Sequence, residues 1–161
     1  MTGKSAATQS PLELSQTPLS LHYEHRRHSH CHCILCGLAN PASLRLKFSK
    51  ADDGSVHTTF RGNALLQGYT GILHGGIISS LLDAAMTHCL FHRNIEAVTG
   101  DLNVRFFHPV PCDAQLEIHA QVVSAHGILY RLESVIVHNN QKLAKASARF
   151  MIPKDARVKS R

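Results

Sequence analysis

Apolar and polar residues alternate along most of the chain from residue 44 onward, with the period of two that predicts β-strands. Residues 44–48 and 56–61 both alternate, and the turn sequence Asp52-Asp53-Gly54 between them predicts a β-hairpin. The same period returns in the last third of the chain, where turn residues or prolines separate the segments. These later strand candidates are residues 101–107, 116–122, 128–137 and 143–151.

One segment, residues 77–91, departs from this alternation because it is apolar on nearly every side of a helix. It follows His74-Gly75-Gly76, so we expect a helix that begins at or just after these glycines. His92-Arg93-Asn94 predicts its end, because cationic side chains suit the carbonyl end of a helix and Asn adopts the left-handed cap conformation. A helix of this composition should be buried.

Together these elements predict an α+β fold in which an antiparallel sheet of about six strands wraps around one long central helix. A single sheet of this kind leaves its edge strands open. Pairing such edges across a two-fold axis is the usual way to cover them. We therefore expect a dimer or a larger assembly.

The composition fits one folded domain with short extensions. The chain has 161 residues, of which 43% are hydrophobic, and none of its apolar runs approaches the ~20 residues that cross a bilayer. Its polar, proline-containing start lacks the apolar centre of a secretory signal. We expect residues 1–30 to be a flexible, histidine-rich leader, residues 31–153 to form the domain, and residues 154–161 to be a basic tail.

Cysteine usage and charge bear on location and partners. The number of cysteines is odd, and Cys31, Cys33 and Cys36 are too crowded for a set of mutual disulfides. A reducing compartment follows, so we expect a cytoplasmic protein without a membrane partner. The net charge of +6 suits a nucleic acid or a small anionic ligand equally well. Lys and Arg are scattered outside the short tail, and we expect no nucleic-acid partner.

A polar stripe runs along the apolar helix. Ser79, Ser80 and Thr87 each lie three or four residues from Asp83, on the same helix face. Periodicity alone gives about half the weight to an ordinary solvent-facing side. An Asp inside an otherwise apolar helix, however, is a poor helix former that gains nothing from capping. This composition favours a chemical role for Asp83.

The glycines at the predicted helix start offer a second part of a reaction centre. Gly75 and Gly76 let a substrate approach main-chain N–H groups at the positive end of a helix, as an oxyanion site requires. Asp83 lies about 10 Å further along the axis than Gly76, at 1.5 Å per residue. A polarised carbonyl and an attacking water could occupy the space between, if a neighbouring subunit closes the other side.

These residues resemble the signature of a known family. Leu73-His74-Gly75-Gly76, followed by an apolar helix with Asp83 nine residues after the histidine, resembles the hotdog-fold acyl-CoA thioesterases of the PaaI-like branch. Residues 98–109 are similar to the strand after the helix in that family, and residues 33–41 to an N-terminal motif found in part of it. The resemblance spans about residues 33–152.

The resemblance implies an enzyme that hydrolyses an acyl-CoA, or a related acyl thioester, to the free acid and the thiol. It implies a homodimer or homotetramer whose active sites lie at subunit interfaces, and no metal or organic cofactor. Asp83 matches the catalytic carboxylate, acting as general base on water or as direct nucleophile. Gly75 matches the N–H that polarises the carbonyl, His74 helps to set that loop, and Thr99 matches a residue that orients the water.

Several further residues are candidates for substrate binding. Gly76 belongs to the exposed helix start. Some relatives carry Asn six residues before the histidine, where this chain has Gly68, and neighbouring Gln67 is the candidate replacement. Arg105, or the turn at Gly127 with its basic neighbours, could meet the phosphates of a CoA carrier. Arg105 is equally well explained as an outward-facing strand residue.

The segment from His28 to Cys36 contains six potential soft metal ligands, and Cys33-x-x-Cys36 is half of a common zinc arrangement. The rest of the sequence contains no further Cys-x-x-Cys. We therefore favour, by about two to one, small apolar packing residues over zinc ligands. A zinc ion here would be structural, and we predict no catalytic metal.

Two other functions remain open from the sequence. A hotdog module that binds acyl-CoA without hydrolysing it would have the same fold. A metal- or nucleic-acid-binding protein could use the histidine-rich and basic ends. A hotdog dehydratase is disfavoured because His74 belongs to a Gly-Gly helix entrance rather than to a histidine-centred site.

Overall fold

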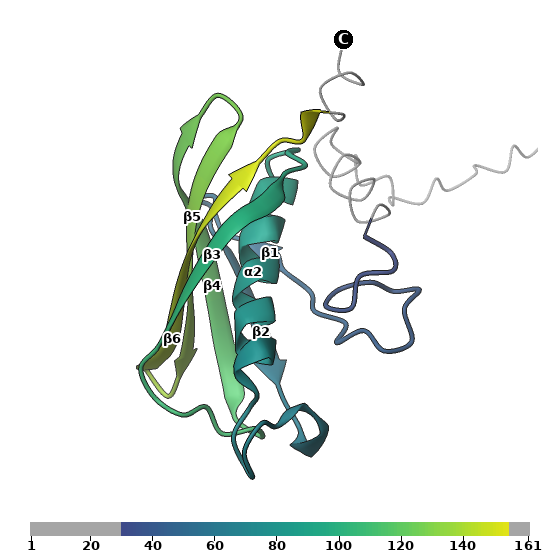
Figure 1. The fold of residues 1–161 in the computed structure, drawn as a ribbon, viewed down its shortest axis with the longest axis vertical. Helices are drawn as coiled ribbons and strands as arrows, with labels where there is room; N and C mark the ends of the chain where they lie inside the picture. Colours follow the sequence, from purple (N-terminus) through teal and green to yellow (C-terminus); the bar gives the residue numbers. More distant parts are fainter. Residues whose placement is uncertain (1–29, 155–161) are drawn as a thin grey trace, which may run out of the picture.

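The computed structural model describes residues 30–154, which contain a six-stranded sheet and one long helix (Figure 1). Apart from His30 and Lys154, the predicted leader and tail lie outside the described residues. The expected α+β fold is confirmed. The elements in chain order are β1 (Ser49–Lys50), β2 (Val56–Arg61), the 3₁₀ helix η1 (Ala64–Leu66), α2 (Gly75–Phe91), β3 (Val98–Phe106), β4 (Gln115–His126), β5 (Leu129–His138) and β6 (Gln141–Met151).

The sheet is antiparallel throughout, with the strand order β1-β2-β4-β5-β6-β3. β1 and β3 are therefore its edges. α2 lies along one face (Figure 1) and contacts β2, β3, β4, β5 and β6, so the sheet curves around the helix. Within the described chain, the nine-residue strand β3 has a neighbour on one side only.

α2 is stable because its apolar surface is covered. Leu81, Leu82 and Met86 have no exposed surface, and the sheet face opposite them consists of the inward-pointing residues of each strand. The helix begins at Gly75, and Asn94 beyond its end has the left-handed φ of 59°. Both predicted helix ends are confirmed.

The strand predicted at residues 44–48 is wrong, since β1 contains only the two residues that follow it. Arg45 has a left-handed backbone with φ 57°, which interrupts an extended strand. The N–H of Leu46 donates to the carbonyl of Leu35 (2.9 Å) in the N-terminal segment instead of to β2. The predicted turn after it is confirmed by Gly54, whose φ is 80°.

A β-bulge interrupts the pairing of β3 with β6. Thr99 lies opposite Phe150 and Asp101 opposite Arg149, so Gly100 is the extra residue. Phe150 is buried on the helix side of the sheet. Thr99 therefore faces the helix, although simple alternation along β3 would place it on the same face as Asp101.

Leu82→Ala is expected to lower the free energy of unfolding by about 2–5 kcal/mol, because it leaves a cavity under α2. Leu65→Ala is the matched control, since Leu82 is 0% and Leu65 is 92% exposed. The control should change stability by less than about 0.5 kcal/mol. Urea unfolding at one fixed protein concentration measures both, and equal losses would contradict this description of the core.

Candidate active site

Asp83 lies half-buried in a hollow between α2, the edge strand β3 and the N-terminal segment. The volume of this hollow is about 310 Å³. We call it the Asp83 hollow. Its lining consists of His30, Cys33, Leu35 and Cys36 from the N-terminal segment, Ser79, Ser80, Asp83, Ala84, Thr87 and His88 from α2, and Thr99 and Leu102 from β3.

The carboxylate of Asp83 is held by the edge strand. The hydroxyl of Thr99 donates a 2.7 Å hydrogen bond to Oδ1 of Asp83. Burial raises the pKa of Asp83, and the Thr99 hydrogen bond opposes part of this rise. The hydroxyls of Ser79 and Thr87 donate to backbone carbonyls of their own helix. The polar stripe on α2 is therefore more than an ordinary solvent-exposed helix face, because it places the partly desolvated carboxylate of Asp83 in a hollow.

The backbone N–H groups of Gly75 and Gly76, at the start of α2, have different hydrogen-bonding partners. The N–H of Gly76 donates to Nδ1 of His74 (2.9 Å), which caps the helix. The proton of the His74 ring is accordingly on Nε2 when the ring is neutral. The N–H of Gly75 makes no hydrogen bond to any other residue between 30 and 154. Of the two predicted donors, Gly75 is the one available to a ligand.

Gly75 opens into a second hollow, of about 510 Å³, which we call the Gly75 hollow. Gly68, Tyr69, His74 and Phe106 are among its lining residues. It shares no lining residue with the Asp83 hollow. The eight residues from Gly75 to Asp83 correspond to about 12 Å of helix. One chain therefore does not bring the carboxylate and the backbone donor into one pocket.

The remaining predicted residues divide into two groups. Gly68 lines the Gly75 hollow, and the side chain of Gln67 accepts a 3.0 Å hydrogen bond from the N–H of Gly71 within the same loop. Gln67 is thus engaged in shaping the loop. Arg105 is exposed on the sheet face away from α2, with its guanidinium 5.3 Å from the centre of the Phe107 ring. Neither Arg105 nor Gly127, which lies in the β4–β5 turn, lines either hollow.

Sequence reasoning missed two features of the site. Phe106 packs beside Gly75, where a Cβ on the glycine would lie 3.5 Å from its ring. The alternation of β3 could have predicted this contact, because it places Phe106 on the same face as Leu102 and Val104, toward the helix. His30, Cys33 and Cys36 form part of the wall around Asp83. No local pattern predicts that contact, because it depends on how the N-terminal segment crosses α2.

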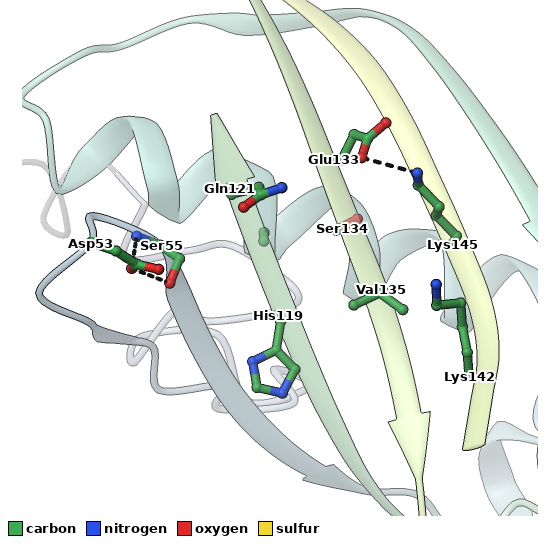
Figure 2. Close-up of a pocket in the computed structure, with 10 residues that line it drawn as sticks. Asp53, Ser55, His119, Gln121, Glu133, Ser134, Val135, Lys142 and Lys145 are labelled. Carbon is green, nitrogen blue, oxygen red and sulfur yellow. Dashed lines mark hydrogen bonds and ion pairs between the residues drawn. The ribbon is translucent and has the colours of Figure 1, made fainter. Parts of the chain in front are cut away.

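A third hollow, of about 300 Å³, lies on the sheet face opposite α2 (Figure 2). His119 and Gln121 of β4 and Glu133 of β5 line it, and Glu133 forms a 2.9 Å ion pair with Lys145 of β6. This hollow contains none of the residues predicted for the site. Asp83, Gly75 and Thr99 thus lie on the helix side of the sheet, away from this hollow.

Comparison with known proteins gives a family match for the segment that contains the site. Residues 70–144 match the model of the thioesterase superfamily. Over 80 residues, covering 50% of this chain, the sequence is 31% identical to acyl-coenzyme A thioesterase THEM4 of Bos taurus, of which the match covers 32%. The chain thus spans less than half the length of the curated relatives that it matches.

Solved structures show the same fold. The PaaI protein from the phenylacetic acid degradation operon of E. coli has a TM-score of 0.67 at 19% identity, over 81% of this chain and 93% of that one. A protein of Streptococcus mutans solved with acetyl CoA has a TM-score of 0.63 at 19% identity, over 67% of this chain and 88% of that one. Among residues 30–154, no helix is long and apolar enough to span a membrane.

Asp83→Asn should make the protein more stable than the wild type at pH 7. Because folding raises the pKa of Asp83, the folded chain holds this proton more tightly than the unfolded chain, and ionisation above the ordinary value of 3.8 weakens the fold. Asparagine cannot ionise, and its carbonyl can still accept the Thr99 hydrogen bond.

Thermal unfolding of both proteins between pH 3 and pH 7 measures this effect. The stabilisation should be absent below pH 3.8, the ordinary pKa of the group, and should grow as the pH rises above it. A variant that is less stable than the wild type at pH 7, or a difference that does not depend on pH, would contradict the desolvated environment of Asp83.

Proposed function

We propose that the chain hydrolyses an acyl-CoA, or a related acyl thioester, to the free acid and the thiol, on the basis of the match of residues 70–144 to the thioesterase superfamily. One observation carries the proposal. A carboxylate with a raised pKa is held by a hydroxyl in a hollow, on the same helix whose first N–H has no partner among residues 30–154. A base and an oxyanion donor are the two groups that this hydrolysis requires.

In the proposed reaction, Asp83 accepts a proton from a water molecule as that water attacks the thioester carbonyl. The carbonyl oxygen becomes an oxyanion, which the N–H of Gly75 stabilises. The carbon–sulfur bond then breaks, and the thiolate takes up a proton. Thr99 keeps the carboxylate in position, since its hydroxyl occupies one carboxylate oxygen and leaves the other for the water. Direct attack by Asp83 on the carbonyl is the alternative first step.

We further propose that the complete site forms between two copies of the chain. The Asp83 and Gly75 hollows are separate within one copy, so a carbonyl cannot contact both groups there. The edge strand β3 borders both hollows through Leu102 and Phe106, which are 37% and 49% exposed. Pairing two β3 edges across a two-fold axis would cover these side chains. It would also set Asp83 of one copy opposite Gly75 of the other.

The relatives support CoA as the carrier, since one is named an acyl-coenzyme A thioesterase and one structure was solved with acetyl CoA. Arg105 and Gly127, which line neither hollow of a single copy, would contact the CoA phosphates only across an interface. We place the protein in the cytoplasm, because its five cysteines form no disulfide with one another.

Asp83→Asn is expected to reduce kcat/KM for acyl-CoA hydrolysis by about 10²–10⁴-fold, the range for loss of a general base. Asp52→Asn is the matched control, because Asp52 is exposed in a turn outside both hollows. A thiol-reactive dye records CoA release from a series of acyl-CoAs. A protein that binds acyl-CoA but releases no thiol would be a binding module and would contradict the proposal.

Gly75→Pro tests the backbone donor directly. Proline removes the N–H but is well tolerated at the first position of a helix. His74, the preceding residue, already has the extended conformation that proline requires (φ −60°, ψ 135°). We expect a folded protein with kcat about 10²–10³-fold lower. Gly75→Ala keeps the N–H and should retain more activity; equal losses would contradict a role for this donor.

Mixed oligomers test the arrangement between copies. Coexpression of Asp83→Asn with Gly75→Pro should restore activity, because one of the two sites in a mixed dimer then combines an intact Asp83 with an intact Gly75. Sites built within one copy would stay inactive in the mixture. Purification through two different tags isolates the mixed dimer for the assay.

A further inference from the structure

His30, Cys33 and Cys36 form a cluster in the N-terminal segment. Their potential ligand atoms, one ring nitrogen and two sulfurs, all lie within 4.8 Å of one another. All three residues are partly buried in the wall of the Asp83 hollow. The ring of His30 packs edge-on against Phe91 at the end of α2, with 4.7 Å between ring centres. The cluster thus lies against the main helix.

The backbone around the cluster is folded about the sulfur of Cys33. The N–H of Leu35, two residues later, donates to this sulfur (3.4 Å). The N–H of Gly37 donates to the carbonyl of Cys33 (2.8 Å), and a Cβ on Gly37 would lie 2.5 Å from the Cys33 nitrogen and the Cys31 carbonyl oxygen. Only glycine fits there. In this tight Cys-x-x-Cys-Gly turn one N–H, that of Leu35, points at the Cys33 sulfur, and it would stabilise the thiolate formed when this sulfur binds a metal.

The ligand set matches a thiophilic cation. Thiolate and imidazole together select zinc among the common divalent ions. At Zn–S of about 2.3 Å and tetrahedral angles, neighbouring ligand atoms are about 3.8 Å apart. The cluster would therefore contract by about 1 Å at most, which side-chain rotation can supply. Zn²⁺ with two thiolates and a neutral imidazole carries no net charge, so it suits a partly apolar wall.

We propose that His30, Cys33 and Cys36 bind one zinc ion, which fixes the N-terminal segment against α2 as a wall of the Asp83 hollow. Water or a further side chain completes the tetrahedron. The segment between residues 30 and 44 has turns but no helix or strand, and a three-point metal clip gives it a defined shape. The role is structural, and it is independent of the proposed hydrolysis.

Cobalt binding to the full-length chain tests the site. The protein is reduced, freed of metal with a chelator, and titrated with Co²⁺. We expect one equivalent to bind with thiolate-to-cobalt charge-transfer absorption, and Zn²⁺ to displace it. Binding without that absorption would mean that histidines alone hold the ion and would overturn the proposal.

Variants locate the ligands. Cys33→Ser with Cys36→Ser should abolish the absorption and weaken zinc binding at least about 100-fold, because both thiolates are lost. His30→Ala should weaken it at least about 10-fold. Cys112→Ser and His32→Ala, which change the same residue types outside the cluster, should leave it unaltered. Unaltered zinc affinity in the double cysteine variant would overturn the assignment.

Hydrogen exchange measures whether zinc orders the N-terminal segment that forms a wall of the Asp83 hollow. Zinc should slow the exchange of amides in residues 30–44 of the wild type and leave those of the double cysteine variant unaffected. Circular dichroism shows whether the sheet and helix of each variant are intact. If zinc binds without slowing this segment, the structural role is wrong.

Discussion

The fold depends on covering a helix that is apolar around almost its whole circumference. The long strands bury one side of α2, while β3 and the N-terminal segment cover the rest incompletely. Asp83 lies at this gap, where it is shielded enough to hold its proton more tightly than an exposed aspartate, yet can still be reached. The same packing that stabilises the domain therefore determines the basicity of its central carboxylate.

The start of the helix follows a similar logic. Two glycines allow close approach, but one of the two N–H groups is needed to close the helix end through His74. The helix is thereby capped without using the donor that points outward from Gly75. If the residue at position 74 had no side-chain acceptor, the N–H groups of Gly75 and Gly76 would both be available to a bound anion. The position of that anion would then be less well defined. By accepting from Gly76, His74 leaves the N–H of Gly75 as the donor without a partner among residues 30–154.

Much of this architecture is predictable from the sequence, because alternation and an all-round apolar segment are local signals. The exceptions have physical causes. The prediction of a strand at residues 44–48 was wrong because Arg45 adopts a left-handed conformation, which the alternation of apolar and polar residues does not reveal. The family resemblance pointed to Thr99 as a residue that orients water, but not to its hydrogen bond with Asp83. Alternation alone would have turned Thr99 to the other face, and the wall around Asp83 depends on a chain crossing with no local pattern.

The bulge at Gly100 makes the orientation of Thr99 depend on residue count. Deleting Gly100 would exchange the inward and outward positions of the residues that precede it in β3. The Thr99 hydroxyl would then face solvent, although every backbone pair with β6 could still form. Adding two residues to the wild-type strand instead would keep Thr99 on the helix side. Evolution can therefore vary the length of the connection between α2 and β3 freely, but can change the strand itself only in steps of two without losing the contact between edge and helix.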